Sequence, residues 1–131
     1  MEQASRRGFV TGESEALFWS GLGRGNAGVL RSQRYALENG GRTLEMTGGG
    51  KYLDDLNLFG PNSPISRAEA ELVWAHASRE FARGASGQIR AVTGSVRPNS
   101  IWRRVELPEL MSNPRVWGID ELNLLPRIGF K

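Results

Sequence analysis

The distribution of apolar and polar residues along the chain predicts several short strands. Residues 16–19 form an apolar run that is typical of a buried strand, and the run ends at Ser20-Gly21. Apolar or alternating segments predict further strands at 42–46, 89–93, 101–107 and 116–117. Because all of these segments are short, they predict a small sheet.

The first predicted helix follows a glycine-rich stretch. Asn26 is placed to cap a helix that runs to about Glu38, and Asn39-Gly40-Gly41 would end it. Residues 48–50 are all glycine and predict a loop, whereas the segment that follows, up to Phe59, fits no single element.

The second predicted helix has a stronger start signal. Ser66 to Glu69 match the Ser-x-x-Glu capping box, so a helix is predicted from about Arg67 to Arg83. One face of this helix would combine Trp74, Ala77, Ser78 and Phe81.

The order strand, helix, strand, helix and then several short strands predicts an α/β or α+β domain around a small sheet. The polar, glycine-containing residues 1–13 predict a tail or linker, which leaves 14–131 as the domain. A length of 131 residues agrees with one domain.

Composition excludes several kinds of chemistry. The chain has no cysteine and one histidine, so it holds no disulfide, thiol nucleophile, cysteine zinc site or imidazole pair. The net charge of +3 is spread out, without the dense basic stripe of a nucleic-acid-binding protein. No apolar run approaches the roughly 18 residues of a membrane span, and the polar N-terminus lacks a signal-peptide core.

Gly23 to Gly28 match G-x-G-x-x-G between a predicted strand and a predicted helix. Backbone N–H groups before a helix suit a phosphate, and Arg24 adds positive charge. The sequence predicts too few parallel strands for a full dinucleotide-binding fold, so the motif favours at most a phosphate-contacting loop.

Carboxylates and tryptophans form a second group of candidates. Glu45 closes an apolar run, and Asp54-Asp55 lies between leucines, where acids are poorly placed for simple solubility. Trp19 and Trp74 are either core residues or platforms that stack on a flat ring. Glu106 is either a solvent-facing acid, a partner of Arg103 or Arg104, or a carboxylate presented into a cleft.

Four segments, in order, resemble the ADP-ribosyl cyclases and NAD glycohydrolases. Phe18-Trp19-Ser20 resembles the Leu-Trp-Ser of that family, and residues 43–56 resemble its Thr-Leu-Glu-Asp-Thr and Leu-Ala-Asp-Asp-Leu segments at the same spacing. Residues 73–82 resemble its Phe-Trp-x-x-x-Ser-x-x-Phe-Ala helix, and residues 104–107 its catalytic Ser-Val-Glu-Val. The resemblance covers roughly residues 15 to 118.

The resemblance implies a compact cyclase-like fold with a small, mainly parallel sheet flanked by helices. It implies that Glu106 is the catalytic carboxylate and that Glu45 influences whether water or adenine captures the intermediate. It implies that Glu45 and Asp54 contact the carboxamide, and that Trp19 and Trp74 position the nicotinamide. The diphosphate and riboses would be met by Ser20, Gly21, Arg24, Ser78 and Trp102.

The resemblance thus implies an enzyme that cleaves the nicotinamide–ribose bond of NAD(P)+, with NAD(P)+ as substrate and neither metal nor cofactor. A small, cysteine-free NAD-consuming domain looks like a bacterial toxin domain that acts in a cytoplasm and is paired with an immunity protein. Neither a nucleic acid nor a membrane is expected as a partner.

The sequence departs from the family in three respects. It lacks the disulfides of the animal enzymes, it is much shorter, and Met46 replaces an acid. Three alternatives remain: a nuclease toxin, a nucleotide-binding module without catalysis, and an ADP-ribosyltransferase.

Overall fold

The computed structural model describes residues 8–22, 26–95 and 100–123. Within them, three strands form one parallel sheet in the order β1-β2-β3. The strands are β1 (Leu17–Ser20), β2 (Gly87–Thr93) and β3 (Val116–Asn123). Trp19 lies opposite Val92 in the register, so the carboxyl ends of the first two strands meet at one edge of the sheet.

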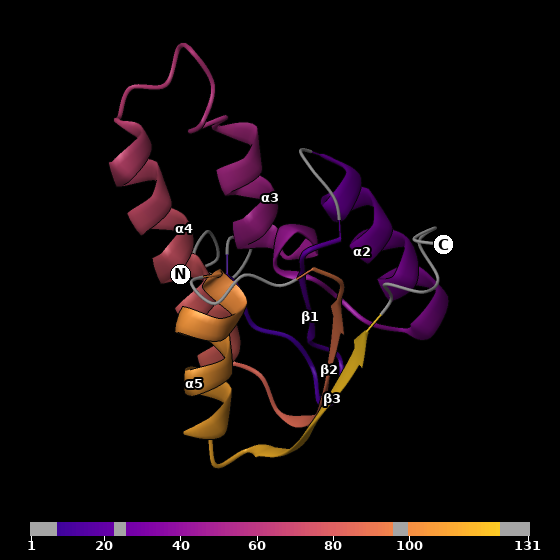
Figure 1. Cartoon of the computed structure of the whole chain (residues 1–131). Coiled ribbons are helices and arrows are strands. Elements are labelled where there is room, and N and C mark those ends of the chain that lie inside the picture. The colour runs from indigo at the N-terminus through magenta and orange to yellow at the C-terminus, as the bar shows by residue number, and fades with distance from the viewer. Residues whose placement is uncertain (1–7, 23–25, 96–99, 124–131) are drawn as a thin grey trace.

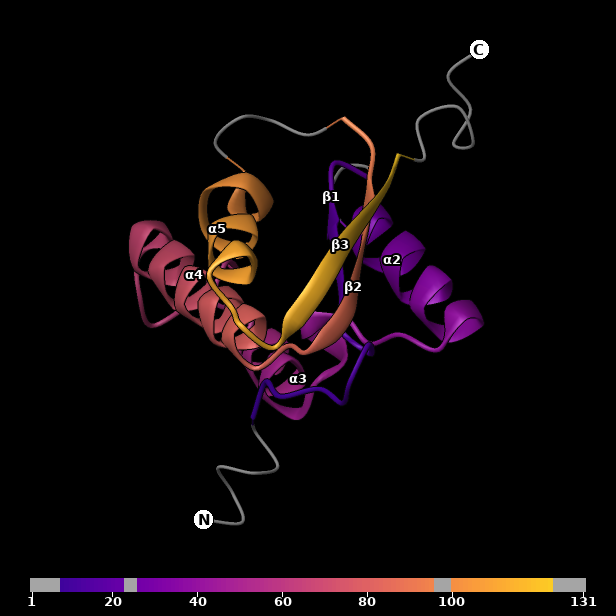
Figure 2. The same ribbon diagram turned by 90° about the horizontal axis from the view of Figure 1, so that it is seen from below.

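Helices cover both faces of this sheet (Figures 1 and 2). Helix α2 (Asn26–Asn39) lies on one face, while α4 (Arg67–Arg83) and α5 (Leu107–Met111) lie on the other. Helix α3 (Gly48–Asp55) follows a 3₁₀ turn, η1 (Leu44–Met46), and contacts both η1 and α4. A stretch of π-helix, η2 (Trp102–Glu106), leads directly into α5. Parallel strands need such crossover connections, and the helices that make them cover the sheet.

The side chains of β1 alternate between two apolar clusters. Phe18 is buried beneath α4 and η2, where its ring centroid lies 4.9 Å from that of Phe81 and 5.6 Å from that of Trp102. Leu17 belongs to the cluster on the other face, with Ala36 of α2. Burying each large apolar side chain contributes about 1.5–3 kcal/mol, so this alternation joins both helical layers to the sheet.

The predicted helix 67–83 is confirmed, and so is its capping box. The Ser66 hydroxyl accepts from the Glu69 N–H at 3.1 Å, and the Glu69 carboxylate accepts from the Ser66 N–H at 2.9 Å. The predicted helix at 26–38 and the strands at 16–19 and 89–93 are also found, and the third strand runs well beyond 116–117.

The strand predicted at 42–46 is wrong. Of this segment only Arg42 makes a β-type pairing, an isolated bridge to Ala16 just before β1, and the chain then turns into η1. The turn is stabilised by Thr47, whose hydroxyl donates to the Leu44 carbonyl at 2.6 Å and accepts from the Gly50 N–H at 2.9 Å. Local capping by Thr47 therefore outweighs the β-like pattern of the segment.

The loop predicted at 48–50 is also wrong, because these glycines form the first turn of α3. A Cβ atom at Gly50 would lie 1.8 Å from the carbonyl oxygen of Leu44. The missing side chain lets α3 begin directly against the backbone of η1.

The strand predicted at 101–107 is wrong as well, because Trp102 to Glu106 form π-helix η2. The buried residues Trp102, Val105, Glu106 and Leu110 recur at helical spacing. The sequence thus contained a helical signal, but the alternation of apolar and polar residues over 101–107 suggested a strand instead.

Residues 8–11 are tied to the domain. The Gly8 carbonyl accepts from the Gly49 N–H at 2.9 Å, Phe9 packs against the core, and Thr11 is buried. The division of the chain after residue 13 stays a prediction.

We expect Gly50→Ala to destabilise the fold by roughly 1–3 kcal/mol, because the new methyl group must displace the Leu44 backbone. Urea unfolding followed by circular dichroism measures this change. Gly12→Ala is the matched control, since its Cβ would lie 3.6 Å from the Glu15 carboxylate in ordinary contact. Equal stability of the two variants would show that η1 and α3 do not need this close approach.

Candidate active site

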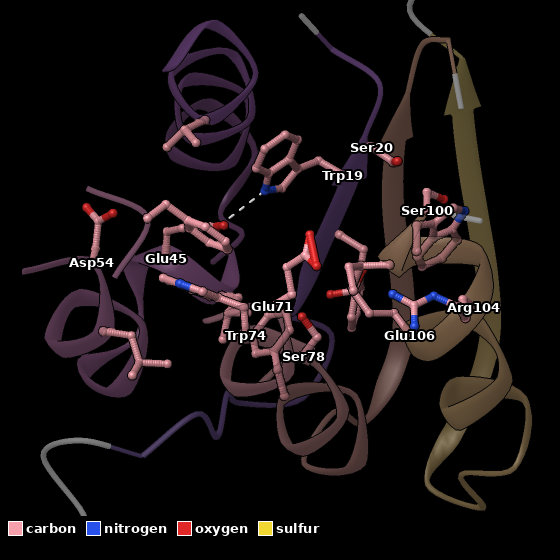
Figure 3. Close-up of a pocket in the computed structure, with 18 of the residues that line it drawn as sticks. Trp19, Ser20, Glu45, Asp54, Glu71, Trp74, Ser78, Ser100, Arg104 and Glu106 are labelled. Atoms are coloured by element: carbon pink, nitrogen blue, oxygen red, sulfur yellow. Dashed lines mark hydrogen bonds between the residues drawn. The ribbon is translucent and has the colours of Figure 1, made fainter. Parts of the chain in front are cut away.

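A pocket of about 1020 Å³ opens beside the carboxyl end of β1 (Figure 3). In parallel α/β sheets, ligands bind outside the carboxyl ends of the strands. Six elements contribute side chains to its wall: β1, α2, η1, α3, α4 and η2. The polar lining residues are Trp19, Ser20, Glu45, Asp54, Asn57, Glu71, Trp74, Ser78, Ser100, Trp102, Arg104 and Glu106.

Glu45 and Trp19 are joined across the pocket wall. The indole Nε1–H of Trp19 donates to Glu45 Oε1 at 3.2 Å, which fixes the carboxylate and the ring relative to each other. Burial raises the pKa of Glu45, the negative charge of Asp54 adds to this effect, and the Trp19 hydrogen bond opposes it. Glu45 is therefore a carboxylate held in place but poorly solvated.

Glu106 is the more deeply buried of the two glutamates, with 7% of its surface exposed. Burial raises the pKa of Glu106 to about 8, with a further contribution from the negative charge of Glu45 and an opposing hydrogen bond from Ser78. Neither Arg103 nor Arg104 forms an ion pair with Glu106 within the described parts of the chain. At neutral pH the carboxyl therefore holds its proton more readily than an ordinary glutamate does.

The π-helical geometry of η2 explains how Glu106 reaches this position. The N–H of Leu107 donates to the Trp102 carbonyl, a bond across five residues that widens the helix. Trp102, Val105 and Glu106 all become buried on the side that faces α4 and β1. Such π-helical turns occur frequently at functional sites.

Trp74 and Ser78 come from one face of α4, as the helical spacing predicts. Trp74 is half-buried: it packs against the core cluster and also lines the pocket. Trp19 likewise packs against the cluster beneath α2 while it lines the pocket. Both tryptophans thus combine packing against the core with a position in the pocket wall, and their stacking on a ligand stays a prediction.

Trp102 lies in the pocket wall but is only 1% exposed. Its ring packs against Phe18, and its buried indole N–H has no hydrogen-bond partner among the described residues. An unpartnered buried donor costs about 1–3 kcal/mol. A direct contact between Trp102 and a ligand stays a prediction.

Ser20 and Gly21 border the pocket where β1 ends. Gly21 has a φ of 68°, and a Cβ there would lie 2.4 Å from the Ser95 carbonyl oxygen, so the position requires glycine. Two bonds tie this turn to the end of β2: Gly94 N–H to the Ser20 carbonyl at 3.0 Å and Ser95 N–H to the Gly21 carbonyl at 2.9 Å.

Of the remaining predicted site residues, Asp54 lines the pocket from α3. Arg24 and the first glycines of the G-x-G-x-x-G motif lie outside the described residues. The structure adds lining residues that the sequence reasoning missed, namely Glu71, Ser100 and Arg104. Glu71 had a usable signal, because it precedes Trp74 by three residues and so shares its helix face.

No group of three or more histidine, aspartate or glutamate side chains able to hold a metal occurs among the described residues. Within the same residues, no helix combines the length and apolar character needed to cross a membrane.

Known structures with the same fold are ADP-ribosyl cyclases. The Aplysia cyclase solved with its substrate NGD and product cGDPR has a TM-score of 0.64 and 21% identity, and the match covers 86% of this chain and 49% of that one. An ADP-ribosyl cyclase in complex with N1-cIDPR gives a TM-score of 0.64, 21% identity and coverage of 86% and 50%. CD38 gives a TM-score of 0.64, 24% identity and coverage of 86% and 51%.

The chain therefore has an ADP-ribosyl cyclase-like fold, confirming the fold that the sequence resemblance implies. It spans about half the length of these solved structures. No protein-family model matches the sequence. No curated protein matches it significantly.

We expect Glu106→Gln to stabilise the folded protein at pH 8.5 by a few kcal/mol and to change its stability little near pH 4.5. Between the ordinary pKa of a glutamate and about 8, the folded protein holds a proton on Glu106 that the unfolded chain has lost. The free energy of unfolding of the wild-type protein therefore falls by about 1.4 kcal/mol per pH unit as the pH rises through that window. Urea unfolding at the two pH values measures the effect.

Glu38→Gln is the control for this measurement, because Glu38 is exposed on α2 and does not line the pocket. It should leave the pH dependence of stability unchanged. A Glu106→Gln variant that keeps the wild-type pH dependence would contradict the assignment of Glu106 as a buried, proton-holding acid.

Proposed function

We propose that the chain is an NAD(P)+ glycohydrolase that releases nicotinamide and leaves ADP-ribose, with some cyclic ADP-ribose. The observation that carries this proposal is the pairing of two poorly solvated carboxylates, Glu45 and Glu106, with two pocket-lining tryptophans. A site of this composition suits a ligand that is flat, aromatic and positively charged. The nicotinamide end of NAD(P)+ has all three properties.

The proposed reaction needs electrostatic stabilisation more than proton transfer. Nicotinamide leaves as a neutral molecule from a cationic ring, so no general acid has to protonate it. The bond that breaks leaves positive charge on the ribose. Glu106 would lose its proton to solvent when the cationic ring binds, and the ionised carboxylate would then stabilise that oxocarbenium-like state. In a water-poor pocket this stabilisation exceeds the value it would have in solvent.

The tryptophans and the second glutamate, Glu45, would orient the nicotinamide ring. Trp74 and Trp19 would stack on or border the nicotinamide ring, and the hydrogen bond from Trp19 would hold Glu45 in one orientation. Glu45 and Asp54 would accept hydrogen bonds from the carboxamide. Ser78, which already donates to Glu106, would keep that carboxylate aimed into the pocket.

The biological setting belongs to the same proposal. We place the activity in a cytoplasm, as an NAD-depleting toxin domain that a cognate immunity protein neutralises, without a nucleic-acid or membrane partner. The absence of cysteine from the sequence supports a reducing compartment.

We expect purified protein to convert NAD+ to nicotinamide and ADP-ribose, and Glu106→Gln to reduce the turnover number about 10²- to 10⁴-fold by removing the stabilising charge. Chromatography of the nucleotides after incubation measures both, and Glu38→Gln serves as the control for the substitution itself. Full activity of Glu106→Gln would remove this residue from the mechanism. Intact NAD+ and NADP+ beside a folded sample would favour a nucleotide-binding module or a nuclease.

A further inference from the structure

Arg104 is the one cationic side chain among the described residues that line the pocket. The described lining contains four carboxylates, those of Glu45, Asp54, Glu71 and Glu106, and no lysine or histidine. Arg104 was not predicted as a site residue. Its guanidinium, presented from η2, makes the charge of the pocket uneven.

Arg104 lies on the side of the pocket away from two of the four carboxylates (Figure 3). Figure 3 shows Arg104 and Ser100 on the side opposite to Asp54 and Glu45. A ligand that fills the pocket would therefore meet Glu45 and Asp54 on one side and Arg104 on the other, where Glu106 of the same π-helix lies beside it (Figure 3).

Arg104 is not neutralised by the acids around it. Among the described residues, no carboxylate forms an ion pair with it, although Arg67, Arg79 and Arg83 all have such partners. Burial and the negative charge of Glu45 raise the pKa of Glu106. An arginine that is exposed, faces a pocket and lacks an acidic partner is available to a ligand anion.

We propose that Arg104 binds the phosphate groups of the substrate and makes the site selective for dinucleotides over phosphate-free nicotinamide nucleosides. The inference rests on the proposed function and extends it to substrate class. A guanidinium presents paired N–H donors that match two phosphate oxygens. NAD(P)+ carries its positive ring and its negative diphosphate at separate points, which matches the separation of Glu45 and Asp54 from Arg104 across the pocket.

The adjacent arginine provides a matched control. Arg103 is also exposed on η2 but does not line the pocket. Arg103→Ala and Arg104→Ala therefore remove the same charge from neighbouring positions of the same helix, and only Arg104→Ala removes it from the pocket.

Steady-state cleavage of NAD+ and of nicotinamide riboside tests the proposal. We expect Arg104→Ala to lower the ratio of kcat/KM for NAD+ to kcat/KM for the riboside about tenfold, mainly through a higher KM for NAD+, since a charged hydrogen bond is lost at an exposed site. Arg104→Lys should restore part of the ratio, and Arg103→Ala should leave it unchanged. An unchanged ratio in Arg104→Ala, or an equal loss for both substrates, would overturn the proposal.

Calorimetric binding of ADP-ribose separates this proposal from the proposed function. ADP-ribose carries the diphosphate but has no bond to cleave. Wild-type protein that binds it about tenfold more tightly than Arg104→Ala, yet leaves NAD+ intact, would support the role of Arg104 and refute the glycohydrolase. Equal affinities in wild type and Arg104→Ala would refute the role of Arg104 whatever the activity.

Discussion

The site depends on one costly feature, the removal of the Glu106 carboxylate from water beside a second acid. An ionised carboxylate in such a place is unfavourable unless a positive charge or a set of donors compensates it. Ser78 supplies one hydrogen bond, and Glu45 adds repulsion. The Glu106 carboxyl therefore keeps its proton to an unusually high pH, and a cationic ligand beside it would favour its ionisation.

Parts of the chain that are distant in sequence must meet to hold this arrangement. Phe18 of β1 packs against Trp102, which fixes η2 on the sheet and turns Glu106 inward. On the opposite wall, Gly50 lets α3 start against η1, and η1 carries Glu45. Packing of the core and the placement of both acids are thus set by the same contacts.

Sequence reasoning recovered the elements whose signals are local. The capping box at Ser66 defined α4, and the buried run at 16–19 defined β1. It failed where a tertiary contact decides the structure: Gly50 reads as a loop residue until the Leu44 carbonyl is placed against it.

The residues of the candidate site were likewise predicted where the sequence itself marks them and missed where only the folded structure does. The resemblance marked Trp19, Glu45, Trp74 and Glu106 as residues of one site, and in the structure all four line the same pocket. The resemblance gave no reason to single out Arg104. In the sequence it looks equivalent to Arg103, and only the structure shows that Arg104 lines the pocket and Arg103 does not. The strand expected around Glu106 was wrong, yet the residue still faces the pocket, since burial of Trp102 and Val105 turns the π-helix that way.

The proton balance of ligand binding tests the central claim most directly. Titration calorimetry of a non-cleavable carbocyclic NAD+ analogue at pH 7, in buffers of different ionisation enthalpy, counts the protons released. The account predicts that the cationic ring drives Glu106 to ionise, with release of close to one proton that disappears in Glu106→Gln. Tight binding without proton release from the wild-type protein would contradict it.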